Sequence, residues 1–133
     1  MPAAYRHSKK VLIVDDDLSV RETLSRFLHS QGFNVESAEN GCAALEILSQ
    51  FSFDLLIVDA HMPRMNGIEL LKCLKKKRIA IPSIFISGLL NKEMRKEARR
   101  LKVVGIIEKP FSLKEIFCNI LLGLKLTRQL NRK

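Results

Sequence analysis

The chain has 133 residues, of which 47% are hydrophobic, and carries a formal net charge of +9 at pH 7. This length predicts one domain with its own core and leaves no room for a second. No apolar run reaches the roughly 20 residues of a membrane span, and the first ten residues lack the apolar core of a signal peptide, so we expect a cytoplasmic protein that does not bind membranes.

The first half of the chain predicts three strands, each followed by a helix. Short apolar or alternating runs at 11–14, 33–38 and 55–58 have the length and pattern of strands. Each is followed by apolar residues at helical spacing, which are Val20, Leu24, Phe27 and Leu28, then Ala44, Leu45 and Leu48, then Ile68, Leu71 and Leu74. The expected helix starts are marked by Asp17, Asn40-Gly41 and Gly67.

The second half continues this alternation. "IPSIFIS" (81–87) enters a strand through Pro82, and "VVGIIEKP" (103–110) contains the fifth strand. A very basic helix is expected between them, and its buried stripe consists of Met94, Ala98 and Leu101. "SLKE" (112–115) matches a capping box that opens the last helix.

Five strands alternating with five helices predict an α/β fold with a doubly wound, five-stranded parallel sheet that is covered on both faces. Right-handed crossovers restrict the topology, and the polar strand at 33–38 suits an edge, which favours the flavodoxin-like strand order 2-1-3-4-5. We expect this domain to span residues 9–126, between an N-terminal tail at 1–8 and a basic C-terminal tail at 127–133.

Charge is distributed unevenly. Residues 1–68 hold six Lys and Arg against nine acids, whereas residues 69–133 hold seventeen against five. We interpret the basic half as solvated helix faces. Nucleic-acid binding is not expected without an output domain, because no helix-turn-helix, finger or aromatic strip accompanies the charge. The three cysteines (Cys42, Cys73 and Cys118) lack any zinc or redox spacing and are predicted to be small, buried apolar side chains that fill the core from helices.

Chemically useful side chains stand where four of the strands end. The first strand is followed by Asp15 and Asp16, and the third, fourth and fifth end in Asp59, Ser87 and Lys109. Ligands of open α/β sheets bind at the carboxyl ends of the strands, where the strand order reverses. We therefore expect these five side chains to converge between the first and third strands.

Three carboxylates in one place repel one another unless a cation is supplied. Lys109 is one candidate, and a divalent metal is the other. Oxygen ligands without a histidine–thiolate set favour Mg²⁺ or Mn²⁺. Asp59 would then be a usable nucleophile toward phosphorus, with the metal, Lys109 and the Ser87 hydroxyl each neutralising one phosphoryl oxygen.

At these residues the chain resembles the receiver domain of a two-component response regulator, over residues 9–124. The resemblance rests on "VLIVDDD", "DAHMPRMNG", "FISG" and "EKPF". It implies that Asp15 and Asp16 are acidic residues of the metal site, and that Asp59 is both phosphoacceptor and metal ligand. It also implies a metal contact from the backbone carbonyl of His61.

In the same family, Ser87 and Lys109 would contact the phosphoryl group, and the Lys109–Pro110 bond is usually cis. The implied function is a phosphoacceptor switch that takes a phosphoryl group on Asp59 from a histidine kinase, a phosphotransfer protein or a small phosphodonor. The fourth helix, fifth strand and fifth helix would form the responding face, on which a second copy or an acidic partner could dock. The domain would not be an ordinary enzyme, but would promote its own Mg²⁺-dependent phosphorylation and dephosphorylation.

The chain departs from the family pattern at two places. Ile106 replaces the usual Tyr or Phe three residues before the lysine, so no ring can rotate to report movement of Ser87. Lys102-Val103 stand where many relatives have Gly-Ala, so the preceding helix is expected to end differently. Near the site, we expect the His61 side chain to point outward and Leu89 to hinder attacking water, which predicts a long-lived phosphoryl group.

Two alternatives remain open at this point. "VLIVDDDLS" also fits a haloacid-dehalogenase-type phosphatase with Asp15 as nucleophile and Asp17 as acid or base, although no adjacent acidic pair follows later in the chain. The domain could also belong to a larger hybrid kinase or DNA-binding regulator.

Overall fold

A five-stranded parallel sheet forms the centre of the computed structural model, which describes the backbone of residues 9–131 and the side chains of residues 9–125. Its strands are β1 (Lys10–Val14), β2 (Asn34–Ala38), β3 (Leu55–Asp59), β4 (Ser83–Ser87) and β5 (Gly105–Glu108), in the order β2-β1-β3-β4-β5. The helices are α1 (Leu18–Ser30), α2 (Gly41–Gln50), α3 (Gly67–Lys76), α4 (Lys92–Arg100) and α5 (Leu113–Asn131). The predicted fold class and strand order are confirmed.

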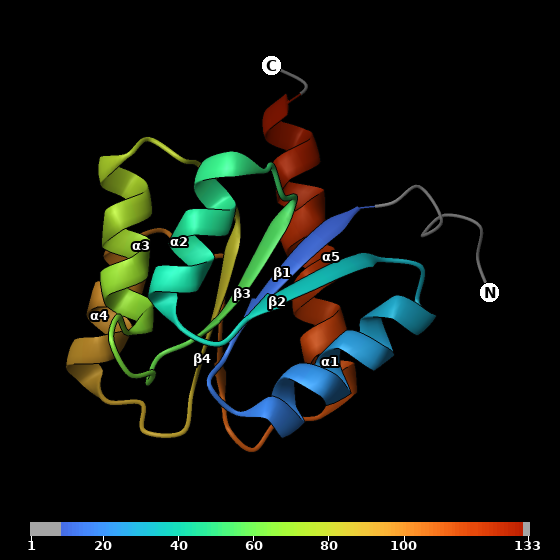
Figure 1. The fold of residues 1–133 in the computed structure, drawn as a ribbon, viewed down its shortest axis with the longest axis horizontal. Helices are drawn as coiled ribbons and strands as arrows, with labels where there is room; N and C mark the ends of the chain where they lie inside the picture. Colours follow the sequence, from blue (N-terminus) through green and yellow to red (C-terminus); the bar gives the residue numbers. More distant parts are fainter. Residues whose placement is uncertain (1–8, 132–133) are drawn as a thin grey trace.

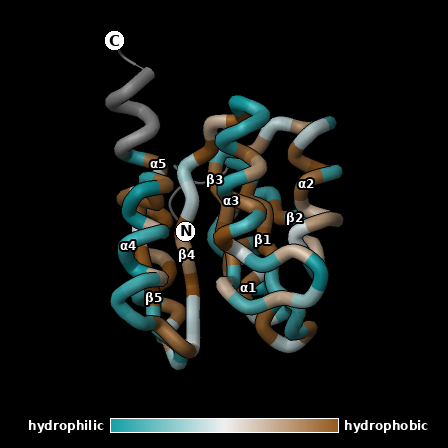
Figure 2. Tube along the Cα trace, turned by 90° about the vertical axis from the view of Figure 1, so that its left-hand side faces the viewer, coloured by the Kyte–Doolittle hydropathy of each residue, from teal (hydrophilic) through white to brown (hydrophobic). Residues whose placement is uncertain are grey.

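The helices cover the sheet on both faces, with α2, α3 and α4 on one side and α1 and α5 on the other (Figure 1). Residues that alternate along the strands supply the two halves of the core, because successive side chains point to opposite faces. Leu12, Leu56 and Phe85 belong to the cluster under α2, α3 and α4. Figure 2 shows hydrophobic residues gathered along the strands, whereas α4 is largely hydrophilic.

Short polar side chains begin the helices, as the sequence predicts. The carboxylate of Asp17 accepts hydrogen bonds from the amides of Ser19 and Val20 and caps α1, and Asn40 caps α2. The third helix is capped by Asn66, whose side chain forms a reciprocal capping box with Glu69. The hydroxyl of Ser112 accepts a hydrogen bond of 3.1 Å from the amide of Glu115, as expected at the start of α5.

Several details differ from the sequence-based expectations. Cys42 and Cys118 lie on helices but are exposed, so the prediction that they fill the core is wrong, and only Cys73 is partly buried. Leu70, which was absent from the predicted stripe of α3, is fully buried. The last helix continues to Asn131 and so includes residues 127–131 of the predicted basic tail, whereas the predicted tail at 1–8 lies outside the described residues.

Two helices end in residues that adopt a left-handed backbone. Arg78 follows α3 and Lys102 follows α4, and each has a φ of 60°. Glycine adopts this conformation without a steric penalty, whereas a side chain with a Cβ costs roughly 1 kcal/mol there. Lys102 is one of the two residues at which the chain departs from the usual Gly-Ala. Within residues 9–131, no helix has the combined length and apolarity needed to span a bilayer.

Gly67 allows the start of α3 to lie directly against the end of β3. A Cβ built at this position would lie 2.5 Å from the backbone oxygen of Asp59 and 3.1 Å from the Cα of Ala60. Both neighbours are backbone atoms and cannot move away independently. The position of Asp59 therefore depends on a residue without a side chain at position 67.

We expect Gly67→Ala to lower the free energy of unfolding by about 1–3 kcal/mol, because the added methyl group forces a backbone shift at the end of β3. Gly88→Ala is the matched control, since a Cβ there would meet only the Lys109 side chain at 3.8 Å. The control is expected to stay within about 0.5 kcal/mol of the unmodified protein. Urea titration of both variants measures the difference, and equal stabilities would contradict this packing.

Candidate functional site

Side chains from four strand ends meet at the carboxyl edge of the sheet. Asp15 and Asp16 follow β1, Asp59 is the last residue of β3, Ser87 is the last residue of β4, and Lys109 comes directly after β5. Strand β1 pairs with β2 on one side and with β3 on the other, so the strand order reverses here. This is the position at which doubly wound sheets bind ligands.

Lys109 joins the two buried carboxylates of the site. Its ammonium nitrogen lies 2.9 Å from Oδ1 of Asp59 and 3.3 Å from Oδ2 of Asp15. Asp59 and Asp15 are only 4% and 2% exposed, whereas Asp16 is exposed to solvent. Carboxylate oxygens of the three aspartates all lie within 4.8 Å of one another. The structure therefore brings four of the predicted residues into direct proximity.

The β1–α1 turn holds Asp15 through contacts that the sequence analysis did not identify. The amide of Asp17 donates a 2.9 Å hydrogen bond to Oδ1 of Asp15, and Arg21 donates one of 2.7 Å to the Asp15 backbone carbonyl. The only sequence signal for Arg21 is its place one helical turn after the capping residue Asp17. Because Arg21 binds the backbone of Asp15, it fixes the turn without contacting the carboxylates.

Burial and mutual repulsion shape the electrostatics of the site. Desolvation is the largest influence on Asp15 and Asp59, and it raises the pKa of each above the usual 3.8 despite the opposing effect of Lys109. Burial alone would lower the pKa of Lys109. The hydrogen bond to Asp59 and the charges of both carboxylates outweigh that burial, so the pKa of Lys109 is raised above 10.5.

Ser87 and His61 lie at the site in different ways. Ser87 is fully buried, and its hydroxyl oxygen accepts a 3.0 Å hydrogen bond from the amide of Leu89. Among the described residues this amide, and not Asp59 or Lys109, is its hydrogen-bond partner. His61 follows β3 by two residues and is exposed, and the Leu89 side chain is 72% exposed. Both are therefore accessible from solvent above the carboxyl edge.

Asp17 does not join the acidic cluster, although it is adjacent to Asp16 in sequence. Its carboxylate is engaged as the N-cap of α1, with hydrogen bonds of 2.9 and 3.4 Å to the first amides of that helix. In the phosphatase alternative, Asp17 would have to serve as acid or base beside Asp15. The cap directs it to the helix instead, which disfavours that alternative.

The donor set at this edge suits a hard divalent cation. All of the candidate side-chain ligands are carboxylate oxygens, which Mg²⁺ and Mn²⁺ prefer over nitrogen or sulfur. Three carboxylates face a single ammonium group, so the cluster carries an excess of two negative charges when ionised. A divalent ion would neutralise that excess, and the exposed Asp16 leaves one side of the cluster open to solvent.

The fold and this cluster define a doubly wound α/β domain with an acidic pocket, able to hold a metal, at its switch point. Comparison with known proteins then shows that the chain belongs to the response regulator receiver domain family, whose model matches residues 11–121. The receiver domain of a Francisella response regulator, 1452, superposes with a TM-score of 0.85 at 30% identity, over 90% of this chain and 99% of that one.

Curated relatives carry the same domain within longer proteins. The chain is 37% identical over 113 residues to the transcriptional regulatory protein CrdR of Helicobacter pylori, covering 84% of this chain and 53% of the relative. It is also 37% identical over 111 residues to the probable transcriptional regulator ycf29 of Pyropia yezoensis, covering 82% of this chain and 50% of that protein. The chain thus spans about half the length of these relatives.

The bond between Lys109 and Pro110 is cis, as the resemblance implied. Ile106, at the position where the family usually has an aromatic residue, is partly buried and is paired with Phe85 across β4 and β5. The fourth helix ends at Arg100, and its C-cap residue Leu101 is followed by Lys102 in the left-handed conformation. Ile106 therefore lies in the sheet beside β4, and Lys102 lies directly after the C-cap of α4.

We expect Asp59→Asn to raise the free energy of unfolding at pH 7 in metal-free buffer by about 1–2 kcal/mol, because it removes a desolvated charge beside Asp15. The pKa of Asp59 is raised in the fold above its usual 3.8, so ionisation destabilises the folded state. The difference in the free energy of unfolding between the Asn variant and the unmodified protein should vanish below pH 3.8. It should grow between pH 3.8 and the raised pKa of Asp59, and stay constant at higher pH. Urea unfolding across this pH range measures the effect, and a difference independent of pH would contradict it.

Proposed function

We propose that this domain is a phosphorylation-dependent signalling switch in which Asp59 accepts a phosphoryl group. The observation that carries the proposal is the contact of Lys109 with both Asp59 and Asp15 inside a cluster of three carboxylates. Family membership supports the same role. The donor would be a histidine kinase, a phosphotransfer protein or a small molecule such as acetyl phosphate.

In the proposed reaction, a carboxylate oxygen of Asp59 attacks phosphorus in line with the leaving group. A P–O bond forms to Asp59 while the bond from phosphorus to the donor breaks, and the leaving group, an imidazole or a carboxylate, departs with that electron pair. Phosphoryl transfer depends mainly on positioning and charge neutralisation. The rigid end of β3 provides the position, and Lys109 lies 2.9 Å from Asp59 to neutralise charge on a phosphoryl oxygen.

We assign the metal site to Asp15, Asp16 and Asp59, with the backbone carbonyl of His61 as a further ligand. When bound there, Mg²⁺ or Mn²⁺ supplies charge neutralisation for the carboxylates and the phosphoryl oxygens. Lys109 remains protonated throughout, because its raised pKa lies far above neutral pH. Hydrolysis of the acyl phosphate returns Asp59 to its carboxylate form, so the domain would also promote its own dephosphorylation.

The proposed switch begins when phosphorylation changes the hydrogen bonding of Ser87. Its hydroxyl oxygen accepts a bond from the amide of Leu89, so a turn of the side chain that directs the O–H to a phosphoryl oxygen would break this bond and free the loop after β4 to shift. The fourth helix follows that loop. It is joined to α3 by the pair Lys72–Glu97 (3.0 Å) and to β5 by Arg95–Glu108 (3.9 Å), both solvent-exposed. Exposed pairs contribute little, about 0–1 kcal/mol each, so they would resist displacement of α4 only weakly.

The responding face in this proposal consists of α4, β5 and α5. Helix α4 presents several basic side chains to solvent, which are Lys92, Lys96, Arg99 and Arg100. Positive charge of this kind favours an acidic protein partner, or a second copy of the domain that contributes acids. The relatives are transcriptional regulators about twice as long as this chain. We therefore also propose that the domain can serve as the receiver of a longer regulator with a DNA-binding module.

Incubation with acetyl phosphate and Mg²⁺ is expected to add one phosphoryl group, detected by intact mass and mapped to Asp59. Asp59→Asn should abolish the addition, because the amide is a poor nucleophile, and chelation of divalent cations should suppress it. Asp54→Asn is the matched control, since Asp54 precedes β3 at the opposite edge of the sheet, where it accepts a bond from the amide of Lys10. Normal labelling of the Asp59 variant would refute the assignment.

Leu89→Asn is expected to shorten the lifetime of the phosphoryl group several-fold, because an exposed apolar side chain beside Ser87 is replaced by one that can orient attacking water. Loss of the phosphoryl mass after removal of the donor measures the rate. Leu122→Asn, a change of equal chemistry on α5 at another exposed leucine, serves as the control. Identical decay in the unmodified protein and in both variants would show that Leu89 has no such effect.

A further inference from the structure

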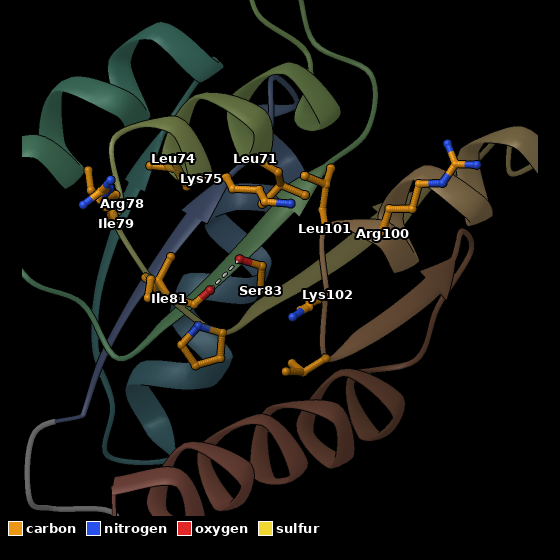
Figure 3. Close-up of a pocket in the computed structure, with 13 residues that line it drawn as sticks. Leu71, Leu74, Lys75, Arg78, Ile79, Ile81, Ser83, Arg100, Leu101 and Lys102 are labelled. Carbon is orange, nitrogen blue, oxygen red and sulfur yellow. Dashed lines mark hydrogen bonds between the residues drawn. The ribbon is translucent and has the colours of Figure 1, made fainter.

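A second cavity lies at the opposite edge of the sheet from the acidic cluster. Its volume is about 620 Å³, within the range of roughly 300–1,000 Å³ that is typical of small-molecule sites. It is bounded by α3 and the turn after it, by the start of β4, and by the segment that connects α4 to β5 (Figure 3). None of the residues assigned to the phosphorylation site lines it.

The interior of this cavity is aliphatic. Its apolar lining consists of Leu71, Leu74, Ile79, Ile81, Leu101 and Val104, together with Ala80 and Pro82. The only neutral polar side chain is Ser83, whose hydroxyl donates a 3.1 Å hydrogen bond to the carbonyl of Ile81 (Figure 3). No aromatic side chain is among the lining residues, so the cavity offers no platform for stacking a nucleobase.

Cationic side chains surround this aliphatic interior. Lys75, Arg78 and Lys102 line the cavity, and Figure 3 shows the Lys102 ammonium directed into it, whereas the Arg100 guanidinium points away. No Asp or Glu lines the cavity. Within the part of the chain whose side chains are described, none of these cations forms an ion pair with a carboxylate. Their charge is therefore available to a ligand.

Two of these cations, Arg78 and Lys102, stand at positions with a positive φ. Arg78 and Lys102 each occupy the left-handed position directly after a helix, where glycine is the favoured residue. Attraction between a cation and a helix C-terminus accounts for basic residues near α3 and α4 in general. It does not account for two long cations at the strained positions that face the same cavity. A ligand that needs both charges would account for them.

We propose that this cavity binds a small aliphatic anion, a molecule with a carboxylate or phosphate head and a flexible hydrocarbon body. The head would contact Lys102, whose ammonium is directed into the cavity, while Arg78 adds positive charge on the opposite side (Figure 3). The body would lie against Leu71, Leu74 and Leu101. A nucleotide is disfavoured because there is no aromatic platform. An acidic peptide would satisfy the cations, but its backbone amide and carbonyl groups would lose hydrogen bonds to water against the aliphatic lining without gaining partners there.

Decanoate, used below the concentration at which it forms micelles, is the test ligand for the isolated protein without Mg²⁺ or phosphodonor. We expect saturable binding by titration calorimetry, with amide shifts in the nuclear magnetic resonance spectrum confined to the end of α3, the start of β4 and residues 100–104. Decyltrimethylammonium has the same chain with the opposite charge, and acetate has the charge without the chain. Equal binding of either control ligand, or shifts elsewhere, would overturn the proposal.

The double variant Arg78→Gly/Lys102→Gly removes the two cations at positions where glycine fits the backbone, so the fold should be retained. It is expected to bind decanoate at least about tenfold more weakly, because the charge-assisted contact with Lys102 and the positive charge of Arg78 are both lost. Lys76→Gln/Lys77→Gln is the matched control, with the same loss of charge on exposed residues that do not line the cavity. Unchanged affinity in the glycine variant, or an equal loss in the control, would refute the site.

An acidic peptide is the competing occupant. Tight binding of a Glu-rich peptide at the same amides, with no binding of decanoate, would overturn the small-molecule assignment. The test is independent of the proposed phosphorylation, because it uses neither donor nor metal and alters no residue of the acidic cluster. Loss of decanoate binding would leave the role of Asp59 unaffected, and failure of phosphorylation would leave this cavity unaffected.

Discussion

The ion pairs that Lys109 makes with Asp59 and Asp15 are the interaction on which the site depends. Two buried carboxylates close to a third would repel one another strongly in a poorly hydrated environment. A single ammonium group compensates part of this repulsion, and the remainder favours any added positive charge. The same imbalance that weakens the fold would therefore favour the binding of a cation, and in the proposed function that cation would offset the repulsion between the carboxylates and an anionic phosphoryl donor. The repulsion that would favour cation binding at this site therefore also lowers the stability of the fold.

The parallel sheet makes this arrangement possible, because it delivers residues that are distant in sequence to one edge. Asp15 and Lys109 are separated by 94 positions, yet their side-chain atoms are 3.3 Å apart. Strands β1, β3 and β4 are buried along nearly all of their length, so their ends are held rigidly, whereas β5 is fully buried only at Ile107. Gly67 contributes from outside the sheet by letting α3 pack against the backbone of Asp59. The functional groups lie at the last residue of a strand or within two residues after it.

Much of the fold and the site could be predicted from the sequence, because both depend on local patterns. Apolar runs of strand length and capping residues such as Asp17 identify the elements, and the acids after them identify the edge. Contacts between elements were harder to foresee. Arg21 binds a backbone carbonyl, which leaves no side-chain pattern, and the cavity beside Lys102 exists only after α3, β4 and α4 pack together. The exposure of Cys42 and Cys118 likewise depends on how far each helix is rotated against the sheet.

Helix α4 is held to the core by few buried side chains, which affects how this protein can evolve. Ala98 is its one fully buried residue and Met94 is partly buried against the core, whereas its remaining surface is formed by charged side chains. Substitutions on that surface should leave the hydrophobic core intact and change the free energy of unfolding little. A binding partner at α4 can therefore be gained or lost during evolution without a compensating stabilising substitution elsewhere. The acidic cluster has no such freedom. The partner bound at α4 can therefore diversify while the acidic cluster is preserved.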